Sequence, residues 1–407
     1  KGAADAKRAA CRGAGEDEAG PDAGALLGLD VLAGCAVPAG FILSRTGISK
    51  LVERNGDLVA VSVCRSPLVP VGRFTDIEDG RVELTELAWM RDGGIWVRLV
   101  VPGTTWRDAR ALVAGLAPFA APVTSANARA VVDWLDAAMV AWSARLPRGF
   151  VASRLGWAGH GASVFQAGET TLQAQDKHVV RLEGLDDGQR DLARSMAARG
   201  NVDGWAEGVA DLLQYPHAQL AVYASVSAPL LRVLGVEPFG VDFSASRGTG
   251  KSTLGRIAAS VWGHPDRLRI AWGGSIAGVE GHASVCCDLP LIADESTGMS
   301  EHQKEDVSRL LYMLLNGRGL PRGSAGSAKG IGLRKTSTWR TVLVSGGEAR
   351  ITSWTRHEGV QVRIFCVESA PFPPGSADLV DRASASLIRH HGHLGPLFDR
   401  WLVAHAG

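Results

Sequence analysis

The spacing of hydrophobic residues predicts a strand-rich first part of the chain that ends in a helix. From about residue 39, short apolar runs alternate with turn residues, and Asn55-Gly56 between two such runs predicts a β-hairpin. Further turns are predicted at residues 79–80 and 93–94. A helix should follow, because apolar residues recur at helical spacing at Val131, Trp134, Leu135, Ala138 and Trp142.

The same pattern divides the whole chain into four regions. Residues 1–37 are rich in Ala, Gly and charged side chains without periodicity, which predicts a linker or disordered tail. Residues 38–200 mix short strands with turns and predict a smaller α+β accessory domain. Residues 201–375 contain a helical region over about 205–236 and alternate strands and helices from 238, which predicts an α/β P-loop ATPase domain, and residues 376–407 are expected to be a C-terminal helical segment. The predicted fold class is therefore α/β.

Composition narrows the classes of function without choosing one. The net charge of +1 does not require nucleic acid as a partner, so any nucleic-acid surface must be local. The apolar stretch at residues 23–43 contains Asp30 and Pro38, which argues against a membrane anchor. The six cysteines lack metal-ligand spacing, so we expect reduced thiols in a cytoplasmic protein. Because the chain begins with Lys1, we expect a fragment of a longer protein.

Residues 245–252 match the phosphate-binding pattern G-x-x-x-x-G-K-S/T at every fixed position except the first, which is Ala245. Two glycines, at 248 and 250, would let consecutive backbone N–H groups turn toward phosphates, and the following helix would point its positive dipole end at them. Lys251 could reach the β- and γ-phosphates, and Ser252 could bind Mg²⁺. The residues expected to hold ATP are Ser246, Arg247, Gly248, Thr249, Gly250, Lys251, Ser252 and Thr253.

An acidic pair follows the next buried strand. The apolar run at residues 289–293 has Pro290 near its start and ends in Asp294-Glu295. Asp294 would hold the Mg²⁺ water shell and Glu295 would polarise the attacking water, which favours hydrolysis over transfer to an acceptor. The alternative is an exposed acidic turn after a strand.

Three further residues are candidates for catalysis. The β run at residues 342–345 ends in Ser345, which could sense the γ-phosphate as a polar residue does in AAA+ ATPases; the alternative is a plain strand-to-turn junction. Arg356 or Arg363 could reach the γ-phosphate of a neighbouring subunit in a ring, and Arg363 falls in the strand-like segment 360–365. Each arginine could equally be a structural ion-pair partner.

The segment at residues 316–340 contains six basic and no acidic residues: Arg318, Arg322, Lys329, Arg334, Lys335 and Arg340. Such a run is either solvated surface or a loop that follows a nucleic-acid backbone, whose contacts would be salt-sensitive. Trp339 is its only aromatic residue, so the sequence gives little support for base stacking.

Several short motifs stand out beside the P-loop. They are Gly156-Trp157 and residues 258–263, 312–314, 316–319, 345–348 and 359–363. Together they resemble the bacterial "domain of unknown function 927" family over about residues 38–400. The resemblance implies a C-terminal ATPase similar to superfamily-three or AAA+-like helicases, which occur beside primase modules on phages, plasmids and genomic islands.

The resemblance also carries roles to individual positions, which are Gly250, Lys251, Ser252, Asp294, Glu295, Ser345 and Arg363. The chain departs from the family pattern at Ala245 and at Tyr215-Pro216, where the family usually has Gly-Asn. The loop at residues 323–335 is also unusual for the family.

The sequence therefore predicts a cytoplasmic, Mg²⁺-dependent ATPase with an AAA+/RecA-like domain that binds ATP. We expect a helicase-like motor in DNA replication of a mobile element. The expected partners are single-stranded DNA, a primase or other replication protein, and further copies in a homo-oligomeric ring, with no membrane. Two alternatives stay open: a P-loop kinase that acts on a small acceptor, and a non-hydrolysing module whose nucleotide state regulates a partner.

Overall fold

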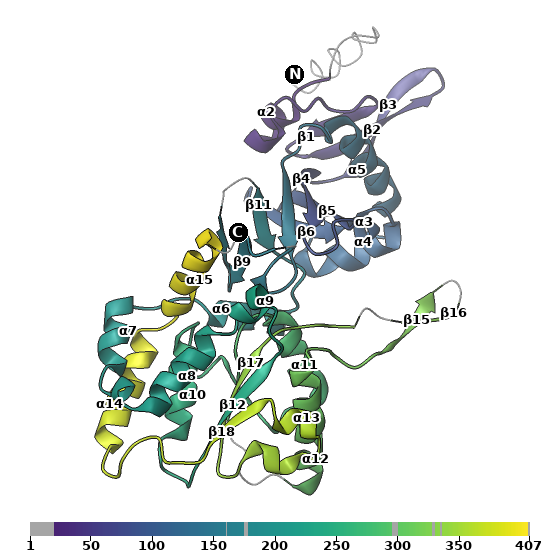
Figure 1. Cartoon of the computed structure of the whole chain (residues 1–407). Coiled ribbons are helices and arrows are strands. Elements are labelled where there is room, and N and C mark those ends of the chain that lie inside the picture. Colours follow the sequence, from purple (N-terminus) through teal and green to yellow (C-terminus); the bar gives the residue numbers. More distant parts are fainter. Residues whose placement is uncertain are drawn as a thin grey trace. The chain divides into compact units, whose positions relative to one another are not determined.

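The computed structural model describes residues 20–159, 161–174, 178–294, 300–327, 330–333 and 336–405, except for the side chains of Glu301 and of residues 324–333. The chain forms two compact units, Lys1–Val151 and Ala152–Gly407 (Figure 1). Each unit has its own hydrophobic core. Over the described ranges, no helix is both long enough and apolar enough to cross a membrane.

Two sheets form the β-structure of the first unit. The first is antiparallel in the order β1-β2-β3, with bounds Phe41–Ser44, Gly47–Arg54 and Asp57–Cys64. Asn55 and Gly56 join β2 to β3 at φ values of 55° and 85°, so the predicted hairpin is confirmed. The second sheet contains neighbours in the order β7-β4-β5-β6, with bounds Arg148–Ala152, Leu68–Asp76, Glu83–Met90 and Trp96–Pro102.

Helices complete the first unit: α3 (Gly103–Trp106), α4 (Ala109–Leu116), η2 (Ala117–Phe119) and α5 (Ala128–Trp142). Helix α5 confirms the predicted helical spacing, because the five residues that define that spacing are all fully buried. They pack in one cluster with Trp89 and Trp106. The large aromatic side chains therefore supply much of the apolar area buried in this unit.

Residues 20–37 belong to this core, so the prediction of a linker or disordered tail is wrong for them. They form α2 (Ala23–Leu27) and η1 (Asp30–Leu32), and Leu27, Leu29 and Leu32 are buried. Trp142 Nε1 also donates a hydrogen bond to Ala36 O at 2.6 Å. The sequence did not indicate that these residues are ordered, because helices this short do not show a hydrophobic period.

A five-stranded parallel sheet lies at the centre of the second unit, in the order β13-β14-β17-β12-β18. The strands are β12 (Phe239–Ser244), β13 (Arg269–Ala271), β14 (Leu291–Asp294), β17 (Val342–Gly347) and β18 (Ile364–Val367). The strands expected before the P-loop, before Glu295 and at Ser345 are confirmed. Because β17 lies between β12 and β14, the carboxyl ends of these three strands meet at one edge.

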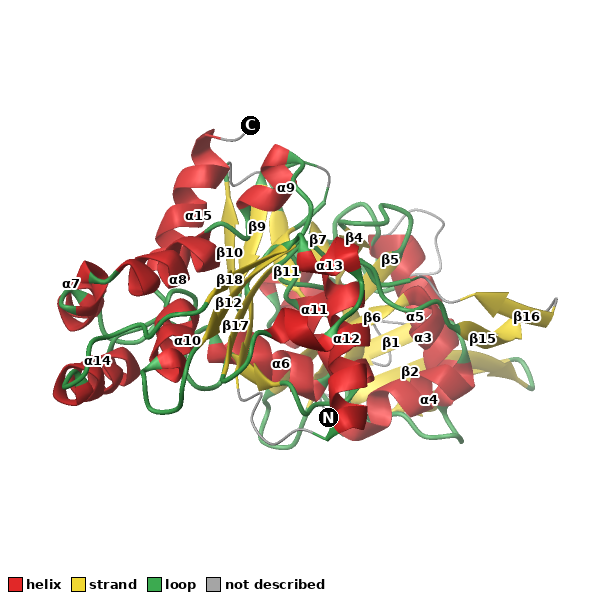
Figure 2. Ribbon diagram, turned by 60° about the horizontal axis from the view of Figure 1, so that its bottom comes forward, coloured by secondary structure: helices red, strands yellow, loops and turns green. Residues whose placement is uncertain are grey.

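Helices cover both faces of this sheet (Figure 2). One face packs on α8 (Pro216–Val226) and α10 (Lys251–Ser260), with α14 (Ala377–Arg389) packed on α10, and the other face packs on α11 (Ile276–Val285) and α12 (Glu301–Leu315). Consecutive residues of β17 point to opposite faces of the sheet: Val344 clusters with Ile257 of α10, whereas Leu343 clusters with Leu314 of α12. A strand buried on both faces reads as a continuous apolar run, as residues 342–344 do.

The remaining described elements of the second unit are β8 (Gly156–Trp157), β9 (Val164–Ala167), β10 (Thr170–Gln173), β11 (Val179–Leu182), α6 (Asp187–Ser195), α7 (Val202–Val209), η3 (Leu212–Gln214), α9 (Leu230–Leu234), β15 (Gly323–Ser327), β16 (Gly330–Leu333), η4 (Ile351–Trp354), α13 (Glu358–Gln361) and α15 (Leu394–His405).

The second unit begins at Ala152, whereas the predicted ATPase domain begins at residue 201. The reason lies in aromatic packing: Trp157 meets Phe165 edge-on at 4.9 Å between ring centroids, and Phe165 stacks on Trp262 at 6.2 Å. Helices α14 and α15 also contribute Leu387 and Leu402 to the same core. The residues that precede the sheet in sequence, and the helices that follow it, therefore share its hydrophobic core.

Candidate active site

The loop between β12 and α10 has the backbone that its glycines predicted. Gly248 and Gly250 adopt φ values of 77° and 92°, which L side chains rarely adopt. At Gly250, a Cβ would also lie 2.5 Å from the ring of Phe372, so the position requires glycine twice over. Ala245 does not have a positive φ, and its N–H continues the sheet by donating to Gly347 O at 3.1 Å. The alanine at this first motif position is thus accommodated without strain.

The loop presents hydrogen-bond donors. The backbone N–H groups of residues 246–252 donate to no acceptor within the described chain. Lys251 Nζ donates to Ser246 O at 2.6 Å, which folds the lysine back over the loop. Burial lowers the pKa of Lys251, and the charges of Glu348 and Asp294 act against that shift. A concave run of N–H groups at the start of a helix, with a lysine across it, fits a phosphate chain.

Asp294 ends β14 at the same edge, and a chain of ion pairs ties it to the P-loop helix. Asp294 pairs with Arg269, and Arg269 pairs with Asp266 at 2.9 Å. Asp266 also binds Arg256 of α10 at 2.9 Å. Burial acts to raise the pKa of Asp266, but Arg256 and Arg269 together hold it below its ordinary value. The network fixes the carboxylate that could hold Mg²⁺ relative to the helix that carries Ser252.

Strand β17, which carries Ser345, lies between β12 and β14 in the sheet. Ser345 is buried; it accepts a hydrogen bond from Trp272 Nε1 at 3.3 Å and lies opposite Asp242 of β12 in the sheet. A Cβ at Gly346 would instead lie 3.5 Å from Asp294 Oδ1 and 3.9 Å from Lys251 Cβ. The sequence reasoning also missed Glu348, whose charge acts on Lys251. Glu348 directly follows the predicted strand, and this position could have indicated a carboxylate close to the P-loop.

The two candidate arginines have different surroundings. Arg363 follows α13 and precedes β18, and its Nη1 donates to Leu315 O at 2.9 Å and to Asn316 Oδ1 at 3.1 Å. The predicted strand over 360–365 is wrong for its first half, because residues 358–361 form α13. Arg356 is exposed, with no ion pair to another described residue. The guanidinium of Arg363 therefore closes the end of α12, whereas that of Arg356 faces solvent.

The basic residues of the segment at 316–340 make different contacts. Arg322 forms an ion pair with Glu280 at 2.6 Å, and Arg340 Nη1 donates to Leu231 O at 2.8 Å. Arg318 is exposed. Strands β15 and β16 pair antiparallel within the segment. The candidate base Glu295 and the basic residues Lys329, Arg334 and Lys335 lie outside the described residues.

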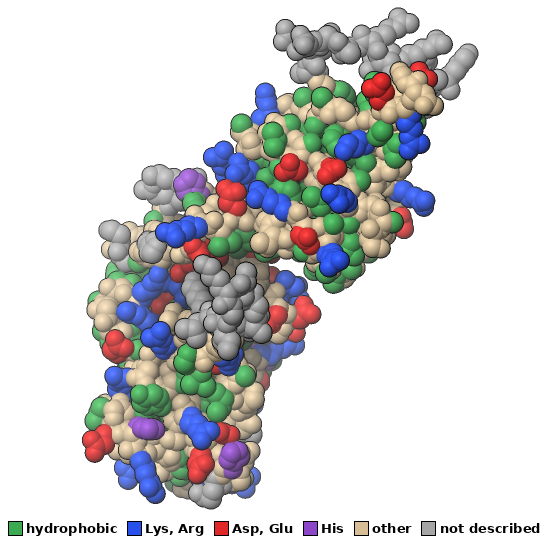
Figure 3. All heavy atoms as spheres, turned by 90° about the vertical axis from the view of Figure 1, so that its right-hand side faces the viewer, with side chains coloured by type: hydrophobic (Ala, Val, Ile, Leu, Met, Phe, Trp, Pro, Cys, Tyr) green, Lys and Arg blue, Asp and Glu red, His purple; other side chains and the backbone are tan. Residues whose placement is uncertain are grey.

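Trp339 cannot stack on a base, because it is buried and its Nε1 donates to Leu314 O at 3.1 Å. On the face drawn in Figure 3, basic and acidic side chains are interspersed over the drawn surface. This mixture agrees with the net charge of +1 and leaves any nucleic-acid contact to a local feature.

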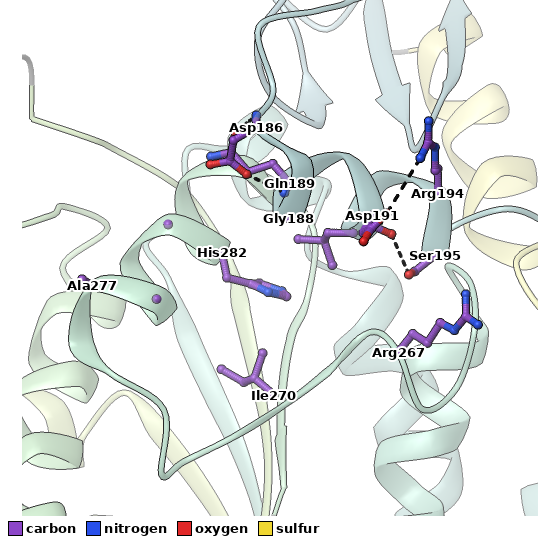
Figure 4. A pocket seen from close by; sticks show the side chains of 13 residues that line it. Asp186, Gly188, Gln189, Asp191, Arg194, Ser195, Arg267, Ile270, Ala277 and His282 are labelled. Atoms are coloured by element: carbon purple, nitrogen blue, oxygen red, sulfur yellow. Dashed lines mark hydrogen bonds and ion pairs between the residues drawn. The ribbon is translucent and has the colours of Figure 1, made fainter. Parts of the chain in front are cut away.

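A large cavity of about 860 Å³ lies away from the P-loop, between α6 and α11 (Figure 4). His282 reaches into it from α11, and Arg267 and Ile270 line it beside β13. Burial lowers the pKa of His282 to about 4, so the imidazole is neutral at pH 7. None of the residues predicted for the active site lines this cavity, so its size alone does not make it the site.

Comparison with known proteins bears on the fold. A family model described as "Domain of unknown function (DUF927)" matches residues 41–331. A solved structure described as "SCCmec type IV Cch - active helicase" is 20% identical, with a TM-score of 0.66 over 90% of this chain and 65% of that chain. The chain thus spans just under two thirds of that protein, whose fold it shares. The apo structure of the NrS-1 C-terminal region, at 8% identity over 79% of this chain and 64% of that chain, has a TM-score of 0.33, too low to support an argument. No curated protein matches the chain.

Proposed function

The chain belongs to the DUF927 family, and we propose that its second unit is a Mg²⁺-dependent ATPase that drives a helicase-like motor. One observation carries the proposal. At a single edge of the parallel sheet, the undonated N–H groups of residues 246–252, Lys251 and Asp294 come together. Phosphoryl transfer requires positioning and charge stabilisation above all, and these groups supply both.

The proposed roles follow from this geometry. Residues 246–253 would hold the phosphates of ATP, with Lys251 leaving Ser246 O to neutralise the β- and γ-phosphates. Ser252 and Asp294 would hold Mg²⁺, which when bound neutralises charge on the phosphates. Glu295 would orient the attacking water, and Ser345 would align the strand that separates Asp294 from the loop.

The proposal extends to an assembly. Among the two candidate arginines, Arg356 is the better one to act in a neighbouring subunit, because Arg363 is already engaged with Leu315 and Asn316. A ring would then place one subunit's arginine at the next subunit's ATP. The helicase-like role, with single-stranded DNA and a primase or other replication protein as partners, is supported by the shared fold and family.

The test is ATP turnover by the full chain, with and without single-stranded DNA, together with the mass in solution. Lys251→Ala should lower turnover at least about 100-fold, because it removes a charge aimed at the phosphates. Lys50→Ala in the first unit, an exposed lysine paired with Asp133, is the matched control and should leave turnover unchanged.

Retained turnover in Lys251→Ala with an unchanged melting temperature would reject the assignment. Phosphate transfer to an added small acceptor would favour a kinase. ATP binding by the wild-type chain without turnover, at concentrations that allow oligomers, would favour a nucleotide-regulated module.

A further inference from the structure

A buried carboxyl group lies in β12, the strand that leads into the P-loop. Asp242 is fully buried, and its Oδ1 has no hydrogen-bond partner in the described part of the chain. Its Oδ2 accepts a hydrogen bond from the Ile351 N–H at 3.0 Å. Burial raises the pKa of Asp242, and the hydrogen bond from Ile351 acts against that shift. A half-satisfied carboxyl group inside a sheet costs stability, and the contact that offsets this cost reaches a residue 109 positions along the chain.

The short helix η4 begins at this hydrogen bond, and a second contact beside it holds the same turn. Ile351 is the first residue of η4, and the hydroxyl of Thr352, the second residue, lies 3.4 Å from Cys366 Sγ on β18. Cys366 and Asp242 are partners in the pairing of β18 with β12. The start of η4 is therefore attached to two neighbouring strands at the same level of the sheet.

The peptide that leaves η4 carries Arg356, the arginine proposed to act in a neighbouring subunit. Thr355, directly before it, is buried, and its Oγ1 accepts a hydrogen bond from the His357 N–H at 3.2 Å. The Thr355 carbonyl accepts another from Gln361 Nε2 of α13 at 2.8 Å. The backbone around Arg356 is thus held in place while its side chain is exposed. A rigid base suits an arginine that stabilises charge, because that role depends on position.

We propose that Asp242 is a positioning residue, which holds η4 and thereby places Arg356 at the ATP of the neighbouring subunit. This inference rests on the proposed function, and it assigns Asp242 to the arginine of its own subunit rather than to its own P-loop. The loop after β12 has a separate attachment to the sheet, because the Ala245 N–H donates to Gly347 O at 3.1 Å. The same strand therefore starts the P-loop of one ATP site and anchors the arginine of the next.

The test is ATP turnover by the full chain that carries Asp242→Ala, alone and mixed with other variants. Alone, this variant should lower turnover at least about tenfold, because a displaced arginine stabilises the transition state poorly. Nucleotide affinity should stay near the wild-type value, because the P-loop is unchanged. Asp242→Asn should keep most of the rate, because its amide oxygen can still accept the hydrogen bond from the Ile351 N–H.

Mixtures of variants separate a role at Arg356 from a role at the P-loop. In a ring, each ATP site combines the P-loop of one subunit with the arginine of the next. Lys251→Ala disables the first and Asp242→Ala should disable the second, so a random mixture of the two should regain turnover at about a quarter of the interfaces. Asp242→Ala mixed with Arg356→Ala should stay inactive, because neither subunit then offers a correctly placed arginine.

The opposite pattern would overturn the proposal. If Asp242→Ala regains turnover with Arg356→Ala but not with Lys251→Ala, Asp242 supports its own ATP site. If it regains turnover with neither, Asp242 serves the fold, and the proposal is equally wrong.

Lys251→Ala mixed with Arg356→Ala is the reference that distinguishes this inference from the proposed function. If this pair regains no turnover, the arginine assigned to the neighbouring subunit is wrong, and the role of Asp242 is lost with it. If this pair regains turnover and the mixture of Asp242→Ala with Lys251→Ala does not, the ATPase assignment stands and only the role of Asp242 is rejected.

Two further variants separate this role from a loss of folding. Ile351→Pro removes the donor instead of the acceptor, at the first residue of a helix and after a residue, Arg350, whose ψ of 128° suits a following proline. It should reproduce the loss of turnover and the rescue by Lys251→Ala, and full turnover in this variant would overturn the proposal. Thr341→Val is the matched control: it removes a buried hydrogen bond, from Thr341 Oγ1 to Leu289 O at 2.7 Å, just before β17 begins. It should lower the melting temperature and leave turnover unchanged.

Discussion

The two edges of the parallel sheet in the second unit present positive charge in different ways. At the carboxyl edge, backbone N–H groups of residues 246–252 without an acceptor in the described chain lie in a loop whose glycines have positive φ, beside Lys251. At the amino edge, Arg154, Arg232 and Arg340 meet in a cavity and are oriented by backbone carbonyls. Backbone N–H groups suit a ligand of fixed shape, whereas the charges of Arg232 and Arg154 act on the buried carboxylate of Asp288.

Each edge also carries one carboxylate next to β14, and the two are held differently. Asp294, the last residue of the strand, is partly exposed and pairs with Arg269 in a network that reaches α10. Asp288, before the strand, is fully buried, and Arg232 and the Trp157 N–H surround one of its oxygens. A partly exposed carboxylate can exchange its partner for a metal ion, whereas a buried one serves the fold.

The largest expected effect tests this distinction at Asp294. Asp294→Asn should lower ATP turnover about 100-fold, because it removes the charge proposed to hold Mg²⁺ while keeping the size of the side chain. Nucleotide affinity measured without Mg²⁺ should stay near the wild-type value, because the loop amides are unaffected. Turnover close to wild type in this variant would remove Asp294 from the catalytic edge and leave it as a partner of Arg269 only.

The two edges also differ in how far the sequence could predict them. The P-loop is one run of eight residues, so its glycines, Lys251 and the helix after it were predictable from local pattern. The arginine cavity draws on residues 154, 232 and 340, which only the folded chain brings together. No local signal distinguishes them from the other arginines of the sequence.

Other features could not be predicted from the sequence, each for a specific physical reason. The strand that holds Ser345 was predictable from its apolar run, but the approach of Gly346 to Lys251 and Asp294 depends on the order of β12, β17 and β14 in the sheet. The pairing of Arg269 with Asp294 depends on β13 and β14 being neighbours in the sheet. Residues 20–37 pack by burying a few leucines in short helices that have no detectable period.

The next largest expected effect concerns Asp399, a second buried carboxylate that, unlike Asp288, accepts no hydrogen bond in the described part of the chain. Asp399 of α15 is fully buried, and neither oxygen has a hydrogen-bond partner in the described part of the chain. Burial, with a smaller contribution from the charge of Asp288, raises the pKa of Asp399 well above its ordinary value. Asp399→Asn should therefore raise the free energy of unfolding at pH 7 by about 1–3 kcal/mol, because an amide does not ionise in the unfolded chain and folding no longer requires the uptake of a proton.

The pH dependence gives this prediction its sign. As pH rises above the ordinary pKa of 3.8, the unfolded chain loses the Asp399 proton before the folded chain does. The wild type should lose stability over that range, up to the raised pKa of the folded state, and Asp399→Asn should not. Denaturant melts at several pH values measure the difference. A stability gain that is the same at pH 4 and pH 7 would show that Asp399 is not the titrating group.

The smallest expected effect is at Ser345, within the carboxyl edge itself. Its hydroxyl is buried and accepts a hydrogen bond from Trp272, so Ser345→Ala should loosen the alignment of β17 and lower turnover by no more than about tenfold. ATP affinity should not change, since the hydroxyl is bonded to Trp272 and not to a residue of the P-loop. Ser345→Thr keeps the hydroxyl and should recover most of the rate if the added methyl group fits. A loss as large as that expected for Asp294→Asn would mean that Ser345 contacts the reacting phosphate directly, and that the edge holds a polar sensor on β17.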